Sequence, residues 1–81
     1  MKTTKLDLAA ALISLGAGLG KIDKTDPRHM EFHLTYSAPF ADEDDWFYNR
    51  KREWDGRTLQ VNARTFSDTL QMLKSEVHKT Y

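Results

Sequence analysis

The first apolar stretch of the chain, KLDLAAALISL (residues 5–15), has helical spacing, with leucines recurring on one side and alanines on the next. A helix that is apolar on so many sides is mostly buried in its domain. Thr4 followed by Asp7 is typical of a capped first turn. The glycines of GAGLG (16–20) predict the helix end, because glycine enters the left-handed backbone region without steric cost.

The next stretch alternates between apolar and polar residues and predicts two strands. MEFHLTY (30–36) places an apolar side chain at every second position, which is the period of a half-buried strand. A shorter strand is expected over residues 19–24. TDPR (25–28) lies between the two and predicts a tight turn, because aspartate before proline favours a bend. The two strands therefore form an antiparallel hairpin.

The most conspicuous stretch, DDWFYNRKREWDGR (44–57), predicts an amphipathic helix that is capped by Asp42 and ended by Gly56. Acidic residues fill its first turn and basic residues its last, which is the order that the helix dipole favours. This charge order needs no ligand, so ordinary packing is the first interpretation and a binding surface is the second. A single apolar stripe is expected along the helix, made of Phe40, Phe47 and Trp54.

The last third of the chain predicts a short strand followed by a helix. Leu59 and Val61 alternate with polar residues, and Asn62 is a suitable cap for the helix after them. The apolar positions of that helix step by three and four, as a core-facing stripe does: Ala63, Phe66, Leu70, Leu73 and Val77. The predicted fold is one small α+β domain over residues 1–81, in the order α-β-β-α-β-α, with the hairpin and a short third strand packed against helices.

The composition limits the classes of function that the chain can have. With 81 residues it has room for one core, whose folding hides about 60% of the surface of the unfolded chain, so homodimerisation is left open as a source of stability. Twelve basic and twelve acidic side chains balance, so no overall field draws the chain to nucleic acid or to anionic lipid. The absence of cysteine excludes disulfides and thiolate metal sites and fits a reducing cytoplasm.

The N-terminus has the outline of a signal peptide, with two lysines, an apolar stretch and small residues after it. Asp7 interrupts the apolar stretch, and removal of the segment would leave a poor core, so a buried helix is the preferred interpretation. No stretch approaches the eighteen or so apolar residues of a membrane span. We therefore expect a cytoplasmic protein without a membrane partner.

Catalytic motifs find little support in the sequence. GAGLGK (16–21) faintly resembles a phosphate-binding loop, but such loops follow a strand and open a helix, whereas this one follows a helix. The serines lack the context of a catalytic triad, and the acids of residues 42–45 lie at a helix N-terminus, where the helix dipole accounts for their negative charge without a catalytic role. We expect no enzyme and no cofactor.

His29, Glu31 and His33 share one face of the predicted strand, with adjacent members about 7 Å apart. Two imidazoles and a carboxylate in this arrangement could bind zinc and leave one position open. The alternative is an ordinary wet face of the hairpin. Because no fourth ligand has a recognisable position, we expect no metal, and the question stays open until the residues are placed in space.

The candidate partner-binding residues lie on the predicted second helix. An aromatic and a guanidinium at the rim of a buried stripe are the residue types that interface hot spots favour. The set comprises Asp45, Trp46, Tyr48, Arg50 and Arg52. A protein partner is expected. Nucleic acid is the alternative, because the basic residues Arg50, Lys51, Arg52, Arg57 and Arg64 and the nearby aromatics could form a basic stacking face.

Three segments together resemble a small uncharacterised family of phage and bacterial proteins, a domain of unknown function. They are LDLAAALISLGAGL, DPRHMEFHL and WDGRTLQVNARTFSDTLQMLKS, which cover most of the chain. The resemblance implies an origin in a phage, prophage or other mobile element, and it implies no catalytic residue. Small phage proteins of this kind are often antagonists of host machinery such as defence systems, so by analogy we expect a non-catalytic interaction protein.

Overall fold

The computed structural model describes residues 1–26, 28–37 and 42–78. Within these residues the chain forms an α+β domain, as the sequence predicts. Its elements are β1 (Lys2–Thr3), α1 (Leu6–Ser14), β2 (Gly18–Asp23), β3 (Glu31–Thr35), α2 (Glu43–Asp55) and α3 (Ala63–Val77).

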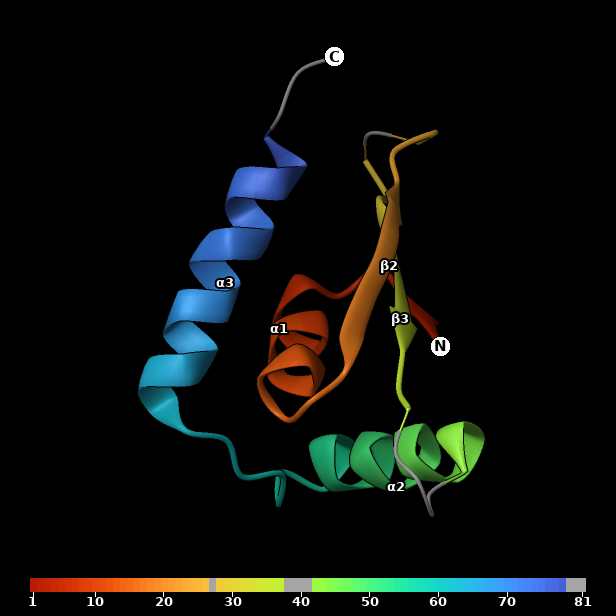
Figure 1. Cartoon of the computed structure of the whole chain (residues 1–81), viewed down its shortest axis with the longest axis vertical. Helices are drawn as coiled ribbons and strands as arrows, with labels where there is room; N and C mark the ends of the chain where they lie inside the picture. Colours follow the sequence, from red (N-terminus) through yellow and green to blue (C-terminus); the bar gives the residue numbers. More distant parts are fainter. Residues whose placement is uncertain (27, 38–41, 79–81) are drawn as a thin grey trace.

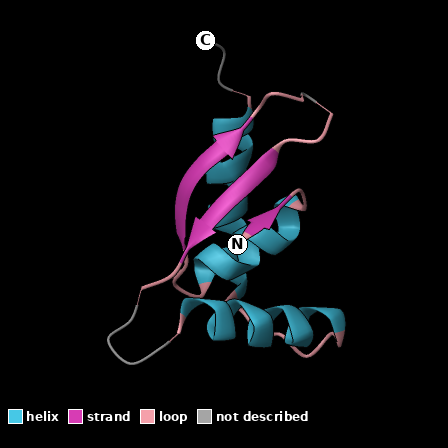
Figure 2. Ribbon diagram, turned by 90° about the vertical axis from the view of Figure 1, so that its right-hand side faces the viewer, coloured by secondary structure: helices cyan, strands magenta, loops and turns pink. Residues whose placement is uncertain are grey.

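The elements are arranged in layers, with α1 between α3 and the sheet (Figure 1). The face of the sheet that is turned away from α1 carries no described helix (Figures 1 and 2). Helix α2 runs across one end of these layers and makes few close backbone contacts with the other described elements. The sheet therefore has one buried face and one open face, and α2 is attached mainly through side chains.

The sheet is antiparallel in the order β1-β3-β2, so β3 is its central strand. Phe32 and Leu34 of β3 are each only 2% exposed and belong to the core beside α1. The residues that alternate with them, including His33, point to the open face because successive side chains of a strand point in opposite directions. The hairpin predicted from the alternation of MEFHLTY is thus confirmed, with a bulge in β2 between Leu19 and Lys21.

The predicted position of the third strand is wrong. Residues 59–61 are described, and none of them lies in a strand; they connect α2 to α3. The third strand is β1, and the pairing with β3 begins one residue earlier, at Met1. The Met1 ammonium group donates to the Leu34 carbonyl at 3.0 Å, and the Met1 carbonyl accepts from the Leu34 N–H at 2.7 Å. A strand of two residues is too short for an alternating pattern to reveal it.

Helix α1 is buried on several sides, as its composition predicts, because α3 and the sheet cover it from two directions. Its buried residues are Leu8, Ala9, Ala10, Ala11 and Leu12. Leu73 of α3 and Phe47 of α2 join the same core cluster. The small alanine side chains allow the neighbouring elements to approach closely, and the leucines fill the remaining volume.

The helix ends agree with most of the predicted caps. Asp42 accepts a hydrogen bond from the N–H of Asp45 at 3.1 Å, and Asn62 accepts one from the N–H of Thr65 at 3.0 Å. The predicted Thr4 cap is wrong: α1 begins after Lys5, which makes no capping bond through its side chain to the described residues. The Asp7 carboxylate instead accepts from the N–H of the next residue, Leu8, at 2.9 Å.

Glycine has different roles at the ends of α1 and α2. Gly16 has a φ of 119°, so it ends α1 in a conformation that side chains rarely adopt, as predicted. Helix α2 ends at Asp55, but Gly56 keeps a helical φ of −81° and the positive φ of 61° belongs to Arg57. Two residues of the predicted patterns, Pro27 and Phe40, lie outside the described residues.

Candidate functional site

The five predicted partner-binding residues all lie on α2, and we call them the α2 surface: Asp45, Trp46, Tyr48, Arg50 and Arg52. The structure divides them by exposure. Asp45, Tyr48 and Arg52 are exposed, whereas Trp46 and Arg50 are partly buried. Because residues four apart are neighbours on a helix, the aromatic and basic members form two pairs, one on each side of α2.

The outer pair consists of Tyr48 and Arg52. Tyr48 is 64% exposed, which makes it the most exposed large hydrophobic side chain among the described residues. The guanidinium carbon of Arg52 lies 5.8 Å from the centre of the Tyr48 ring, within the range of a cation–π interaction. A mostly apolar hollow adjoins the ring and is lined by Met1, Asp44, Phe47, Tyr48 and Lys51. An aromatic ring, a cation and a shallow apolar depression therefore lie together on one face.

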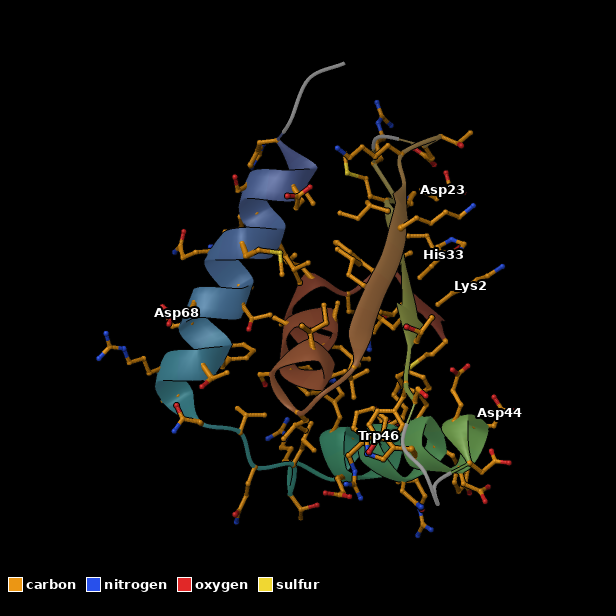
Figure 3. All side chains as sticks on the ribbon, viewed as in Figure 1. Lys2, Asp23, His33, Asp44, Trp46 and Asp68 are labelled. Carbon is orange, nitrogen blue, oxygen red and sulfur yellow. The ribbon has the colours of Figure 1, made fainter. Side chains whose placement is uncertain are left out.

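The inner pair consists of Trp46 and Arg50 and has a packing role. Trp46 stacks on Tyr36, with ring centroids 4.0 Å apart and an angle of 6° between the planes, and it meets Phe47 edge-on at 5.1 Å. Arg50 lies 5.9 Å from the Trp46 ring centre. The sequence did not predict Tyr36 as a residue of this site, although it is the last apolar position of the alternating stretch MEFHLTY. Trp46 thus serves to hold α2 against the end of the sheet (Figure 3).

Acidic residues of the same helix pair with two of the basic side chains of α2. Arg50 pairs with Glu53 at 2.5 Å, and Lys51 pairs with Asp55 at 2.7 Å. Arg52 forms no ion pair within the described part of the chain, and its guanidinium stays beside Tyr48. The positive charge available to a ligand on α2 is therefore concentrated at Arg52. These pairs follow the three- and four-residue spacing that helices favour, so the sequence carried a signal for them.

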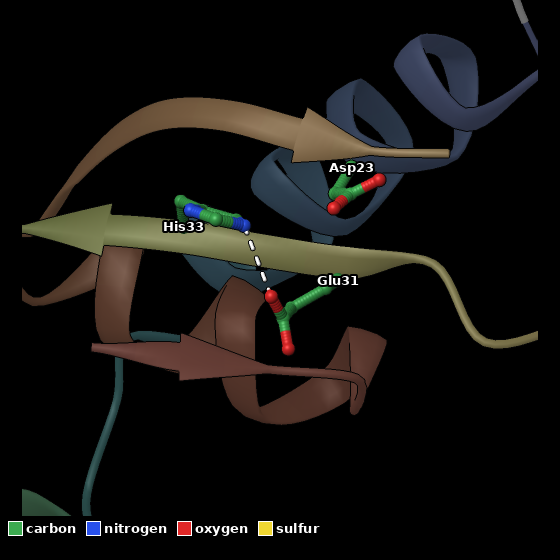
Figure 4. A group of neighbouring side chains, drawn as sticks. All are labelled: Asp23, Glu31 and His33. Carbon is green, nitrogen blue, oxygen red and sulfur yellow. Dashed lines mark ion pairs between the residues drawn. The ribbon is translucent and has the colours of Figure 1, made fainter. Parts of the chain in front are cut away.

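A second group of polar side chains lies on the open face of the sheet (Figure 4). His33 Nε2 lies 3.1 Å from Glu31 Oε1 on the same strand, and Asp23 of β2 stands opposite Glu31 in the strand register. One ligand atom from each of the three lies within 4.8 Å of the others. His29, which the sequence grouped with Glu31 and His33, precedes β3, is exposed, and is outside this group.

The carboxyl group of Asp23 is held in its ionised form by its neighbours. Hydrogen bonds from the side chain and the backbone N–H of Thr25 lower its pKa, and the nearby charge of Lys21 lowers it further. The backbone bond, from Thr25 N to Asp23 Oδ1, measures 2.9 Å. Asp23 was missed at the sequence level because it lies in a different strand, and only the hairpin register brings it to Glu31.

None of the described helices has the length and apolar character needed to cross a membrane. Comparison of the chain with family models, with curated proteins and with solved structures found no match.

Proposed function

We propose that this chain is a non-catalytic interaction protein of a phage or other mobile element, that it acts in the cytoplasm, and that it binds a protein partner through the α2 surface. The observation that carries the proposal is the 64% exposure of Tyr48 beside the Arg52 guanidinium. By analogy with other small phage proteins, the partner belongs to host machinery such as a defence system.

The pairing of Tyr48 with Arg52 suits protein recognition. Tyrosine and arginine are enriched among the residues that contribute most to binding energy at protein interfaces. Because Arg52 already lies over the Tyr48 ring, fewer rotamers have to be lost on binding than for two independent side chains. The adjoining hollow at Met1 and Phe47 offers apolar area that a partner side chain can cover.

A nucleic-acid-binding accessory protein is the second candidate. Tyr48 can stack on a base, and Arg52 and Arg57 are exposed cations on or next to α2. Against this candidate, Arg50 and Lys51 are paired with acids of their own helix, and the chain has no net charge. The ion pairs favour the protein partner.

Affinity capture with matched variants tests the proposal. Tagged wild-type protein, Tyr48→Ala and Met72→Ala are incubated with a bacterial lysate, and the bound proteins are identified by mass spectrometry. Met72 is the matched control, because it is also an exposed large hydrophobic residue, 41% exposed, but lies on α3. We expect a protein that the wild type and Met72→Ala enrich and Tyr48→Ala does not. Equal enrichment by all three would contradict a role for the α2 surface.

Gel-shift titration over a salt series tests the second candidate. Binding through phosphate contacts weakens steeply as salt rises, because each neutralised phosphate releases condensed counterions. We expect no shift of single-stranded or double-stranded nucleic acid at physiological salt. A shift that weakens with salt and is lost in Arg52→Ala would favour the nucleic-acid candidate over the protein partner.

A further inference from the structure

We propose that Asp23, Glu31 and His33 form a binding site for a zinc ion on the open face of the sheet. The site is separate from the α2 surface and does not depend on the function proposed for it. The sequence predicted no metal and grouped His29 with Glu31 and His33. The structure instead places Asp23 beside Glu31 and His33.

The relation between His33 and Glu31 is the first observation that points to a cation. His33 Nε2 is buried and lies 3.1 Å from Glu31 Oε1, yet it has no hydrogen-bond partner of acceptable geometry among the described residues. Buried polar atoms normally have such a partner. The two atoms form an ion pair in the metal-free chain (Figure 4), and their spacing also allows both of them to bind one cation.

The spacing of the ligand atoms suits zinc. Bonds of about 2.0–2.2 Å in a tetrahedral arrangement place neighbouring ligand atoms roughly 3.3–3.5 Å apart, close to the 3.1 Å between His33 and Glu31. All three ligand atoms lie within 4.8 Å of one another, so a small side-chain rotation completes the set. Imidazole favours zinc over magnesium and calcium, which prefer oxygen ligands alone. Three protein ligands leave one position for water.

The hairpin holds the three ligands in place. Glu31 and His33 lie two residues apart on the central strand, so they point to the same face, and the strand register places Asp23 opposite Glu31. The backbone N–H of Thr25 donates to Asp23 Oδ1, and this hydrogen bond orients the carboxylate on the hairpin. Hydrogen bonds to a ligating carboxylate of this kind are a usual feature of metal sites.

Two lysines oppose the binding of a cation and give the proposal a further test. Lys2 and Lys21 are the strand partners of His33 on its two sides, so both lie on the open face. The carboxylates of Asp23 and Glu31 neutralise the two charges of zinc. The two lysines therefore leave a net positive charge near the site, which repels the cation. Removal of one lysine should therefore strengthen binding, and Lys21→Gln is the cleaner choice because Lys2 lies in the short strand β1.

The experiment uses metal-free full-length protein, titrated with zinc chloride by calorimetry and followed by thermal melting. We expect one zinc ion per chain and a saturable rise in melting temperature, with no rise from magnesium. His33→Ala should abolish both effects, whereas His29→Ala, which removes an exposed histidine just outside the cluster, should leave both unchanged. Lys21→Gln should tighten binding severalfold.

The outcomes that overturn the proposal are distinct. They are the absence of saturable binding at micromolar zinc, retention of binding in His33→Ala, and loss of binding in His29→Ala. Because each variant is compared with its own metal-free form, a change in basal stability does not obscure the result. Where His33→Ala fails to fold, Glu31→Gln and Asp23→Asn take its place, and each is expected to weaken zinc binding at least about tenfold.

Discussion

Trp46 of α2 lies flat against Tyr36, the residue that follows β3, with ring centroids 4.0 Å apart and planes 6° apart. The same two segments are joined a second time, because the N–H of Tyr36 donates to the carboxylate of Glu43 at 3.1 Å. Since α2 makes few close backbone contacts with the other described elements, these links and the buried Phe47 fix its position. The orientation of the α2 surface thus depends on this stack.

The stack should be measurable as a coupling energy. We expect Trp46→Ala and Tyr36→Ala each to lower the free energy of unfolding, and a double-mutant cycle to give a coupling of about 0.5–1.5 kcal/mol. Chemical denaturation of the four proteins measures it. Tyr48→Ala is the control on the same helix, because its ring is exposed, and it should change stability by less than about 1 kcal/mol. Strict additivity of the two mutations would contradict a stabilising stack.

The core position of α3 that matters most is Leu73. It is fully buried, whereas Leu70 and Phe66 of the same predicted stripe are only partly buried and Ala63 is exposed. Leu73→Ala should lower the free energy of unfolding by about 2–5 kcal/mol, through lost apolar contact and the cavity left behind. The neighbouring Met72→Ala should cost less than about 1 kcal/mol in the same denaturation assay, because that side chain is exposed. A larger loss for Met72→Ala than for Leu73→Ala would show that the helix faces the other way.

The two helix-ending glycines should respond differently to alanine. Gly16 has a φ of 119°, which is strained for any side chain, while Gly56 has a φ of −81°, which alanine adopts readily. At Gly56 a new Cβ would lie 3.3 Å from the Arg52 carbonyl oxygen, a tight contact that offsets part of the entropy gained. We expect Gly16→Ala to cost at least about 1 kcal/mol more than Gly56→Ala in thermal or chemical unfolding. Equal costs would place the strain elsewhere.

Local patterns predicted most of the fold because the features concerned are local. The apolar spacing of residues 5–15, the alternation of MEFHLTY, and the caps Asp42 and Asn62 each depend on residues within a few positions of one another. The third strand did not follow from such a pattern, since β1 has only two residues and pairs with a strand about thirty positions away.

The candidate sites were predicted less completely for the same reason. The α2 surface was named from helical spacing, but the stack of Trp46 on Tyr36 spans a connection whose path the sequence does not specify. The meeting of Asp23 with Glu31 depends on the hairpin register, which a bulge at Leu19/Lys21 shifts. A register change of one residue would turn Asp23 to the other face, so strand spacing alone could not find this ligand.

Tyr48 and Arg52 should act as one unit in partner binding. Each of Tyr48→Ala and Arg52→Ala should shift stability by less than about 1 kcal/mol, because both side chains are exposed and Arg52 forms no ion pair with the described residues. Each should weaken the affinity for the captured partner at least about tenfold, or ~1.4 kcal/mol. The double variant should lose less binding free energy than the sum of the two single losses, since either change breaks the contact of the guanidinium with the ring.

Tyr48→Phe, which keeps the ring and removes the hydroxyl, should bind nearly as the wild type does. Melting curves and calorimetric titrations of the four variants provide the measurement, and normal binding by the folded single variants would move the partner site from α2 to the open face of the sheet.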